Sequence, residues 1–263
     1  MNIAYKCALV PEQIESKNKL ELQNIEVQLL PGDDLSLIKK IQGKIVSIHL
    51  PLPPFCNLTS IIEAIKNNGD DLKLIKESIE WCKKLNCGLV VHANITLEKL
   101  YNMDKEEVLI NFINESGIVW HIENVTDEIS NENDCIKAPV QICDYINKKL
   151  KKQICFPLLD ICHFLMIQEN FCSSLKCNLK QAIEMYKSDN YYVHLSDKLG
   201  SGDPHTGGVH GFNFKYNEPL LTNILKTCER YNPTLVLEVY ENDYGDPLNA
   251  MALHERIEKI MTE

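Results

Sequence analysis

The sequence predicts an α/β fold, a single (β/α)8 TIM barrel over residues 1–263. Short runs rich in β-branched residues alternate with amphipathic helical runs about eight times. Strands separated by helices pair in parallel, because each helix carries the chain back to the same end of the sheet. A chain of 263 residues has the usual length of one such barrel, and no linker rich in Pro, Gly or Ser divides it. We therefore expect one domain.

The eight expected strands follow one another along the whole chain, and each is a short apolar run. They span residues 3–7, 25–30, 45–50, 88–92, 118–125, 154–160, 191–195 and 234–239. The clearest helix lies at 70–86, where apolar residues recur at steps of three and four and so share one face. Further helical runs are 96–113, 140–152, 175–188, 219–231 and 249–261.

The composition limits the possible partners and the compartment. A net charge of −10 argues against a broad basic surface for nucleic acid. Arg230 and Arg256 are the only arginines, so bidentate phosphate clamps are scarce. Eleven cysteines without a C-x-x-C pair do not look like a disulfide framework or a zinc–thiolate site. No targeting segment and no apolar run of membrane-spanning length is visible, so we expect a soluble, cytoplasmic protein that does not bind membranes.

Polar residues end most of the expected strands. The active site of such a barrel lies at the carboxyl ends of its strands, so these residues are expected to face one cavity. Nine side chains from six successive strands and one following loop meet this condition: His49, His92, Glu123, Asp160, His163, His194, Asp203, His205 and Glu238. A histidine at a strand end, such as His49 or His92, is equally typical of a rim or core residue.

The carboxylates in this set point to metal binding. An unpaired Glu123 or Glu238 would cost several kcal/mol to bury. The inward positions of these strands offer no obvious lysine or arginine as a partner. Five imidazoles with four carboxylates suit zinc, manganese or iron(II) without any thiolate. Because nine ligands are too many for one ion, we predict two or three bound ions.

These residues resemble endonuclease IV (AP endonuclease family 2), within the xylose-isomerase-like TIM-barrel superfamily, in their order His…His…Glu…Asp-x-x-His…His…Asp-x-His…Glu. The phrases that carry the resemblance are HIENV, LLDICHF, HLSDKLGSGDPH and LVLEVYE, and it spans the chain from His49 to Glu238. It implies a metal-dependent hydrolase of DNA repair. Such an enzyme is a phosphodiesterase that cleaves apurinic/apyrimidinic sites through a hydroxide generated at a di- or trinuclear zinc centre. Its substrate would be abasic DNA or another phosphoester.

The resemblance also implies a role for each ligand. Glu123 would bridge two ions, the first of which also binds His49 and His92. The second ion would bind Asp160, His194 and Glu238. The third ion would bind His163, Asp203 and His205. Glu238 and Glu123 would be the catalytic carboxylates, with Glu238 orienting or deprotonating the nucleophile.

Three further residues are candidates for contact with the substrate. Lys198 follows His194 closely and is the best nearby cation for a phosphate, and His210 lies in a glycine-rich loop. Phe55 could act as an apolar wedge, although a phenylalanine in a proline-rich loop is more often a packing residue. The chain departs from the family in the loops that contact DNA, for example with Pro204 where the family carries an arginine. We therefore expect activity on abasic duplex that is weak or requires low salt.

A sugar isomerase or epimerase of the same superfamily is the alternative. In that case one divalent ion would polarise a ketose while Glu123 and Glu238 move a proton. The ligands of that single ion would be Glu123, Asp160, His194 and Glu238. The additional residues that favour the endonuclease interpretation are His49, His92, Asp203 and His205. A barrel with purely structural ions is a third possibility, and ligands at the catalytic rim argue against it.

Overall fold

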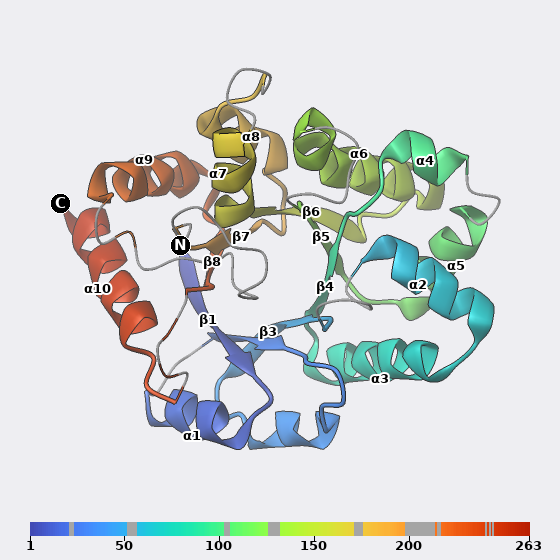
Figure 1. Cartoon of the computed structure of the whole chain (residues 1–263), viewed down its shortest axis with the longest axis horizontal. Helices are drawn as coiled ribbons and strands as arrows, with labels where there is room; N and C mark the ends of the chain where they lie inside the picture. The colour runs from blue at the N-terminus through green and yellow to red at the C-terminus, as the bar shows by residue number, and fades with distance from the viewer. Residues whose placement is uncertain are drawn as a thin grey trace.

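Eight parallel strands close into one barrel in sequence order, β1 to β8, within the part of the chain that the structure describes (Figure 1). The structure is a computed structural model. It describes residues 1–20, 24–51, 57–102, 106–125, 132–170, 176–197, 214, 217–239, 241, 243 and 245–263. The first strand pairs with the second and with the eighth, which closes the ring. The expectation of a (β/α)8 barrel is therefore confirmed.

Each strand overlaps the range expected from the sequence. The strands are β1 (Asn2–Ala8), β2 (Asn24–Gln28), β3 (Lys44–His49), β4 (Gly88–His92), β5 (Trp120–Glu123), β6 (Cys155–Asp160), β7 (Tyr192–Leu195) and β8 (Thr234–Leu237). All of them contain β-branched or other apolar residues whose side chains are buried. Apolar runs of this length are typical of parallel strands, because parallel strands are covered on both faces.

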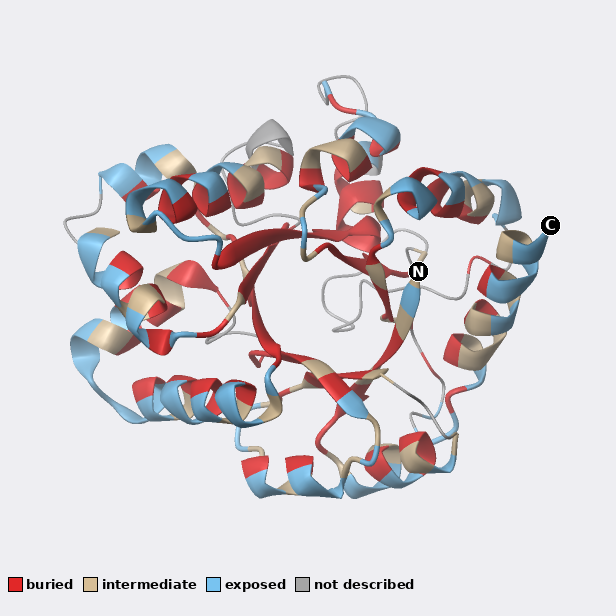
Figure 2. Cartoon of the chain, turned by 180° about the vertical axis from the view of Figure 1, so that it is seen from behind, coloured by how far each residue is buried: buried red, intermediate tan, exposed pale blue. Residues whose placement is uncertain are grey.

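Helices surround the barrel and turn their apolar faces toward it. They are α1 (Pro11–Lys19), α2 (Leu58–Asn67), α3 (Asp70–Leu85), α4 (Leu97–Tyr101), α5 (Glu106–Ser116), α6 (Glu132–Leu150), α7 (Ile161–Asn170), α8 (Leu179–Tyr186), α9 (Glu218–Cys228) and α10 (Leu248–Thr262), with short 3-10 turns η1 (Leu35–Lys40) and η3 (Glu229–Tyr231). Figure 2 shows buried residues on the inner side of the helices and exposed residues on the outer side. This division follows from the three- and four-residue spacing of apolar residues.

Several helices differ from the sequence-based expectation. The run 96–113 was expected as one helix, but the structure has α4 and α5, with residues 103–105 between them outside the described part. Helix α6 was expected from residue 140, yet it begins at Glu132 and includes Pro139. Helices α1, α2 and α7 were not among the expected runs. Helix α7 begins directly after the last residue of β6, so a single continuous apolar segment contains both elements.

Two apolar layers form the core. The larger cluster fills the space between the strands and the helices. A smaller cluster lies inside the barrel and consists of Ala4, Val90, Leu158, Tyr192 and Val236. Alternate strand residues therefore point inward and outward, as a pleated strand requires. The inner cluster closes the barrel below the carboxyl ends of the strands, so polar groups at those ends sit on an apolar floor.

Nine cysteines in the described residues are free thiols, and all of them are buried. In the same residues no helix combines the length and the apolar character needed to cross a membrane.

Candidate metal centre

A cluster of polar side chains lies at the carboxyl ends of the barrel strands. His49, His92, Glu123 and Asp160 are the last residues of β3, β4, β5 and β6. His194 lies in β7 beside Asp160, and the register also places His92 beside Glu123. Glu238, the next candidate ligand, follows directly after β8. The closed barrel thus brings together residues that are up to 189 positions apart in the sequence, from His49 to Glu238.

Seven of the nine expected ligands lie in this cluster: His49, His92, Glu123, Asp160, His163, His194 and Glu238. The other two, Asp203 and His205, lie outside the described residues. The expected substrate contacts Phe55, Lys198 and His210 lie outside them as well.

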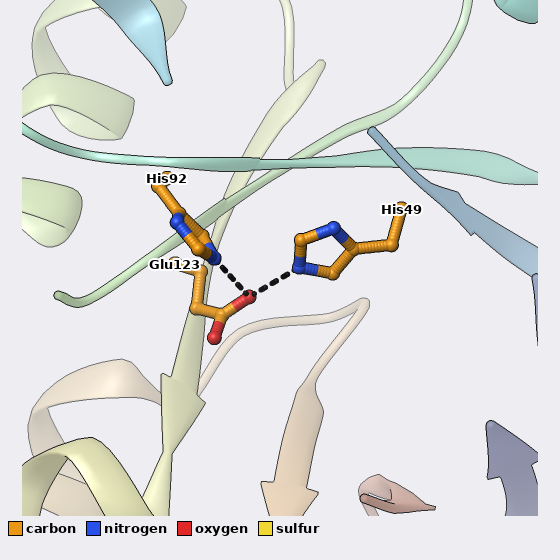
Figure 3. Close-up of side chains that lie close together, drawn as sticks. All are labelled: His49, His92 and Glu123. Carbon is orange, nitrogen blue, oxygen red and sulfur yellow. Dashed lines mark hydrogen bonds and ion pairs between the residues drawn. The ribbon is translucent and has the colours of Figure 1, made fainter. Parts of the chain in front are cut away.

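Glu123 is the centre of the cluster, and its carboxylate is 1% exposed. Its Oε2 atom lies 3.1 Å from His49 Nε2 and 3.6 Å from His92 Nε2, and both rings point toward this oxygen (Figure 3). His194 Nδ1 approaches the same oxygen at 3.4 Å. The second oxygen, Oε1, lies 3.5 Å from His163 Nδ1. Imidazole nitrogens therefore approach both oxygens of this carboxylate.

His194 connects Glu123 to the other side of the barrel. Its Nδ1 atom lies 2.9 Å from Glu238 Oε2 and 3.8 Å from Asp160 Oδ2. Three carboxylates therefore converge on one ring nitrogen that is fully buried.

Asn124 holds the ends of β5 and β6 together beside this group. Its side-chain Oδ1 accepts the backbone N–H of Asp160 at 2.7 Å, and its Nδ2 donates to the Asp160 carbonyl at 3.2 Å. The Asp160 carboxylate in turn accepts the backbone N–H of His163 at 2.7 Å, at the start of α7. In the Asp-x-x-His motif, Asp160 precedes the first turn of α7, and the free backbone N–H of His163 in that turn orients the Asp160 carboxylate.

Backbone carbonyls fix the orientation of two histidines. Leu50 O accepts from His49 Nδ1 at 2.8 Å, and Asn124 O accepts from His163 Nδ1 at 2.8 Å. A carbonyl can only accept, so in each neutral ring the proton is assigned to Nδ1. The Nε2 lone pair of each ring is then available to a metal, as is usual for histidine ligands with such a partner.

The charges in the cluster perturb its pKa values in opposite directions. Burial raises the pKa of Glu123, but the opposite charges of His194 and His92 outweigh it and hold the pKa well below the ordinary value. Burial lowers the pKa of His92 to about 3, more than the neighbouring Glu123 raises it. For His163 burial is again the largest effect, yet Asp160 and Glu123 together raise the pKa. Near neutral pH Glu123 is therefore an anion and His92 a neutral ring, which are the forms that bind metal.

Two charged residues in the cluster were missed by the sequence analysis. Lys6 in β1 forms an ion pair with Glu238, and its Nζ lies 3.5 Å from Glu26 Oε1 in β2. The expectation that no lysine or arginine accompanies the buried carboxylates is therefore wrong. Lys6 and Glu26 each interrupt an apolar strand, IAYKCAL and NIEVQL. A charged residue within an apolar strand is the sequence signal that could have found them. The sequence analysis considered only polar residues at strand ends, and Lys6 and Glu26 lie before the ends of β1 and β2.

His121 lies in β5, below Glu123. It was expected to be a core histidine rather than a ligand, and it packs against Tyr192 with ring centroids 4.2 Å apart. It is buried, and among the described residues neither of its ring nitrogens has a hydrogen-bond partner.

The donor atoms fit divalent metal ions. Among the described residues three groups each place their ligand atoms within 4.8 Å of one another: His49, His92 and Glu123; Glu26, His194 and Glu238; and Glu123, Asp160 and His163. Imidazole nitrogen and carboxylate oxygen are the ligands that zinc, manganese and iron(II) accept. Glu123 occurs in two of the groups, as a bridging carboxylate would.

Comparison with known proteins shows the fold. No protein-family model matches the sequence, and no curated protein sequence matches it. An AP endonuclease of family 2 from Brucella melitensis is 12% identical with a TM-score of 0.52, and the match covers 92% of this chain and 94% of that one. An L-ribulose 3-epimerase is 13% identical with a TM-score of 0.59, over 100% and 96% of the two chains. A 3-keto-D-glucoside 4-epimerase from E. coli is 17% identical with a TM-score of 0.57, over the full length of both.

These solved structures include both an endonuclease and epimerases, all built on the same barrel. Identities of 12–17% show a common fold and do not choose between the two activities. The choice therefore has to come from the residues of the site.

Proposed function

We propose that the chain is a metal-dependent phosphoesterase resembling endonuclease IV, which acts on abasic DNA or on another phosphoester. The observation that carries the proposal is the position of His49 and His92. Their Nε2 atoms lie 3.1 and 3.6 Å from one oxygen of Glu123. A single ion held by the quartet of Glu123, Asp160, His194 and Glu238 does not need these two imidazoles. Together with Glu123 they supply three ligands for another ion.

Bound zinc, manganese or iron(II) ions would act as Lewis acids that stabilise the negative charge developing on the phosphate oxygens and on the leaving oxygen. The chain has only two arginines, so bidentate arginine contacts to the phosphate are scarce. Clustered divalent ions therefore account for how a protein of net charge −10 could neutralise a phosphate.

The side chains that solvent reaches mark where a substrate would enter. The side chains of Glu238, His92 and Lys6 are 16%, 12% and 11% exposed, whereas that of Glu123 is 1% exposed. Glu238 is held on one oxygen by Lys6 and on the other by His194. A fixed carboxylate at the solvent-facing edge can orient an attacking water and accept its proton. Glu123, which water does not reach, is left with the role of holding positive charge.

A sugar isomerase or epimerase is the second candidate. Two observations support it: epimerases are among the structural neighbours, and Glu123, Asp160, His194 and Glu238 converge on one another. In that case Glu123 and Glu238 would exchange a proton with the carbon next to a ketose carbonyl.

The test is a pair of activity panels on the same metal-loaded protein. The first contains an abasic oligonucleotide duplex at several salt concentrations and a simple phosphodiester, and the second contains ketoses and sugar phosphates. Zinc, manganese and iron(II) are each supplied, and a chelator is the negative control. We expect metal-dependent ester cleavage, with activity on abasic duplex that is weak or falls steeply as salt is raised.

Two glutamate variants make this test specific. Glu238→Gln should lower turnover by about 100-fold or more, because it removes a ligand charge and the group that positions water. Glu241→Gln is the matched control, since Glu241 is also buried but binds the backbone N–H groups of Asn249 and Ala250 at the start of α10. Epimerisation of a ketose with no ester cleavage under any metal would overturn the proposal.

A further inference from the structure

A buried carboxylate–histidine pair lies beneath the proposed metal centre. Glu26 in β2 and His194 in β7 are both 0% exposed, and His194 Nε2 is hydrogen-bonded to Glu26 Oε2 at 3.3 Å and lies 3.1 Å from Oε1. Glu26 Oε2 also accepts the hydroxyl of Ser47 at 2.6 Å. Lys6, Glu26 and Ser47 are register partners on β1, β2 and β3, so they form one level of the barrel wall.

The two nitrogens of His194 face different surroundings. Nε2 faces Glu26, and Nδ1 faces Glu238 at 2.9 Å and Glu123 at 3.4 Å. A neutral imidazole carries one proton, and a carboxylate can only accept a hydrogen bond. A proton on Nε2 that is donated to Glu26 leaves the lone pair of Nδ1 directed at the carboxylates of the proposed centre.

Lys6 argues against Glu26 as a metal ligand itself. Glu26, His194 and Glu238 could in principle hold an ion. However, the Lys6 ammonium already forms an ion pair with Glu238 and lies 3.5 Å from Glu26. Both oxygens of Glu26 already face partners, Oε1 the Lys6 ammonium and Oε2 the Ser47 hydroxyl and His194 Nε2. Glu238 differs because it meets Lys6 through Oε1 and directs Oε2 at His194 Nδ1, where an ion could bind.

We propose that Glu26 is a positioning residue, which holds His194 as the Nε2–H tautomer and so prepares Nδ1 to bind a metal ion. The inference rests on the metal centre of the proposed function. His49 and His163 are oriented through backbone carbonyls, on Nδ1. His194 is oriented through a charged side chain, on Nε2. A carboxylate partner makes a ligand histidine more basic as well as fixing its orientation.

Metal binding without substrate tests the inference. Wild type, Glu26→Gln and the control Glu241→Gln are stripped of metal, and their zinc affinity is measured by competition with a chromophoric chelator. We expect Glu26→Gln to weaken the binding of one ion by about 10–100-fold. Glu241→Gln should bind as wild type does. A Glu26→Gln affinity within threefold of wild type for every ion would overturn the proposal.

The tautomer of His194 gives a second readout that a purely structural role would not produce. Long-range nitrogen–proton NMR spectra of the zinc-loaded wild type should show the His194 proton on Nε2. A proton on Nδ1 would overturn the proposal whatever the affinities are.

A double variant covers the case in which Glu26→Gln fails to fold because Lys6 loses a charged partner. Lys6→Met with Glu26→Gln removes one positive and one negative charge while nearly keeping the volume, and such paired replacements are often tolerated. It should bind the same ion about 10–100-fold more weakly than wild type, and wild-type affinity in this variant would contradict the inference. Neither readout depends on catalysis. A protein that binds zinc as expected but cleaves no ester would therefore refute the proposed function and leave the role of Glu26 intact.

Discussion

One carboxylate oxygen of Glu123 is surrounded by more imidazole nitrogens than it can accept hydrogen bonds from. Imidazole nitrogens of His49, His92 and His194 lie 3.1, 3.6 and 3.4 Å from one of its oxygens. A single oxygen cannot accept three ideal hydrogen bonds from rings that are this crowded. The crowding is what a metal position between the rings and the carboxylate would relieve.

Replacing Glu123 with Gln removes the charge that the two proposed ions would share. We expect at least one ion fewer per chain in elemental analysis of protein purified without chelator. In the metal-free protein at pH 7 we expect the free energy of unfolding to fall by about 3–5 kcal/mol, because buried histidines lose their anionic partner. Urea unfolding measures this fall, with Glu241→Gln as the control. Unchanged metal content in Glu123→Gln would refute the bridging role.

His121 makes the stability of the protein depend on pH. Burial lowers its pKa to about 3, while its ordinary value is 6.5. A group whose pKa is lowered by folding contributes stability above its unfolded pKa, and this contribution is lost as pH falls from 6.5 toward 3. Between pH 6 and 4 the free energy of unfolding should fall less steeply in His121→Leu than in wild type, by about 1 kcal/mol per pH unit. Urea unfolding of the metal-free proteins at pH 7, 6, 5 and 4 measures it, and parallel pH profiles for the two proteins would count against this account.

Sequence reasoning identified the candidate ligands that end strands but not Glu26 and Lys6, which lie beside them. His49, His92 and Glu123 follow apolar runs at positions where a barrel exposes strand ends to one cavity. Glu26 and Lys6 lie further down their strands, where the sequence pattern shows an interruption without showing what faces it. Their pairing with His194 and Glu238 depends on barrel closure between β1, β2, β7 and β8, and no local pattern contains that information.

At the scale of elements, the strands and most helices were predictable, but α1, α2 and α7 were not. Runs such as 88–92 contain β-branched and other apolar residues, so their state is determined locally. Helix α7 continues directly from β6, and neither composition nor a gap in hydrophobicity marks the boundary. The carboxylate of Asp160 marks it instead, by accepting the backbone N–H of His163. Asp160 therefore caps the N-terminus of α7, but the sequence analysis considered this residue only as a candidate metal ligand.

The start of β4 is shaped by a side chain of β5. A Cβ atom at Gly88 would lie 2.6 Å from Cδ2 and 2.7 Å from Nε2 of His121, closer than atoms can approach. We expect Gly88→Ala to lower the free energy of unfolding by about 1–3 kcal/mol through overpacking. Combining it with His121→Ala should cost clearly less than the sum of the two single changes, since the clashing ring is gone. A double-mutant cycle by urea unfolding measures this coupling, and strict additivity would mean that the two residues do not press on each other.

At the scale of the molecule, the described residues gather buried carboxylates at one end of the barrel. The buried carboxylates of Glu26, Glu123 and Asp160 lie at the carboxyl ends of the strands or one level below, with Lys6 as the partner of the first. Net charge of −10 adds to the cost of keeping them together. Divalent cations would offset this cost directly, so their binding should appear as folding stability as well as activity.

Thermal unfolding should therefore depend on metal concentration. An ion that binds the folded chain alone stabilises it by about 2.7 kcal/mol when its free concentration is 100 times its dissociation constant. For a domain of this size that energy corresponds to a rise in Tm of about 5–10 °C. We expect zinc, manganese or iron(II) to produce such a rise in the chelator-treated protein, and we expect magnesium, which prefers all-oxygen sites, to produce a smaller one. The rise should be reduced in Glu123→Gln and retained in Glu241→Gln. A Tm that stays constant across all four metals would show that the cluster of imidazoles and carboxylates is a structural ion-pair network, and both the phosphoesterase and the epimerase would then lose their common basis.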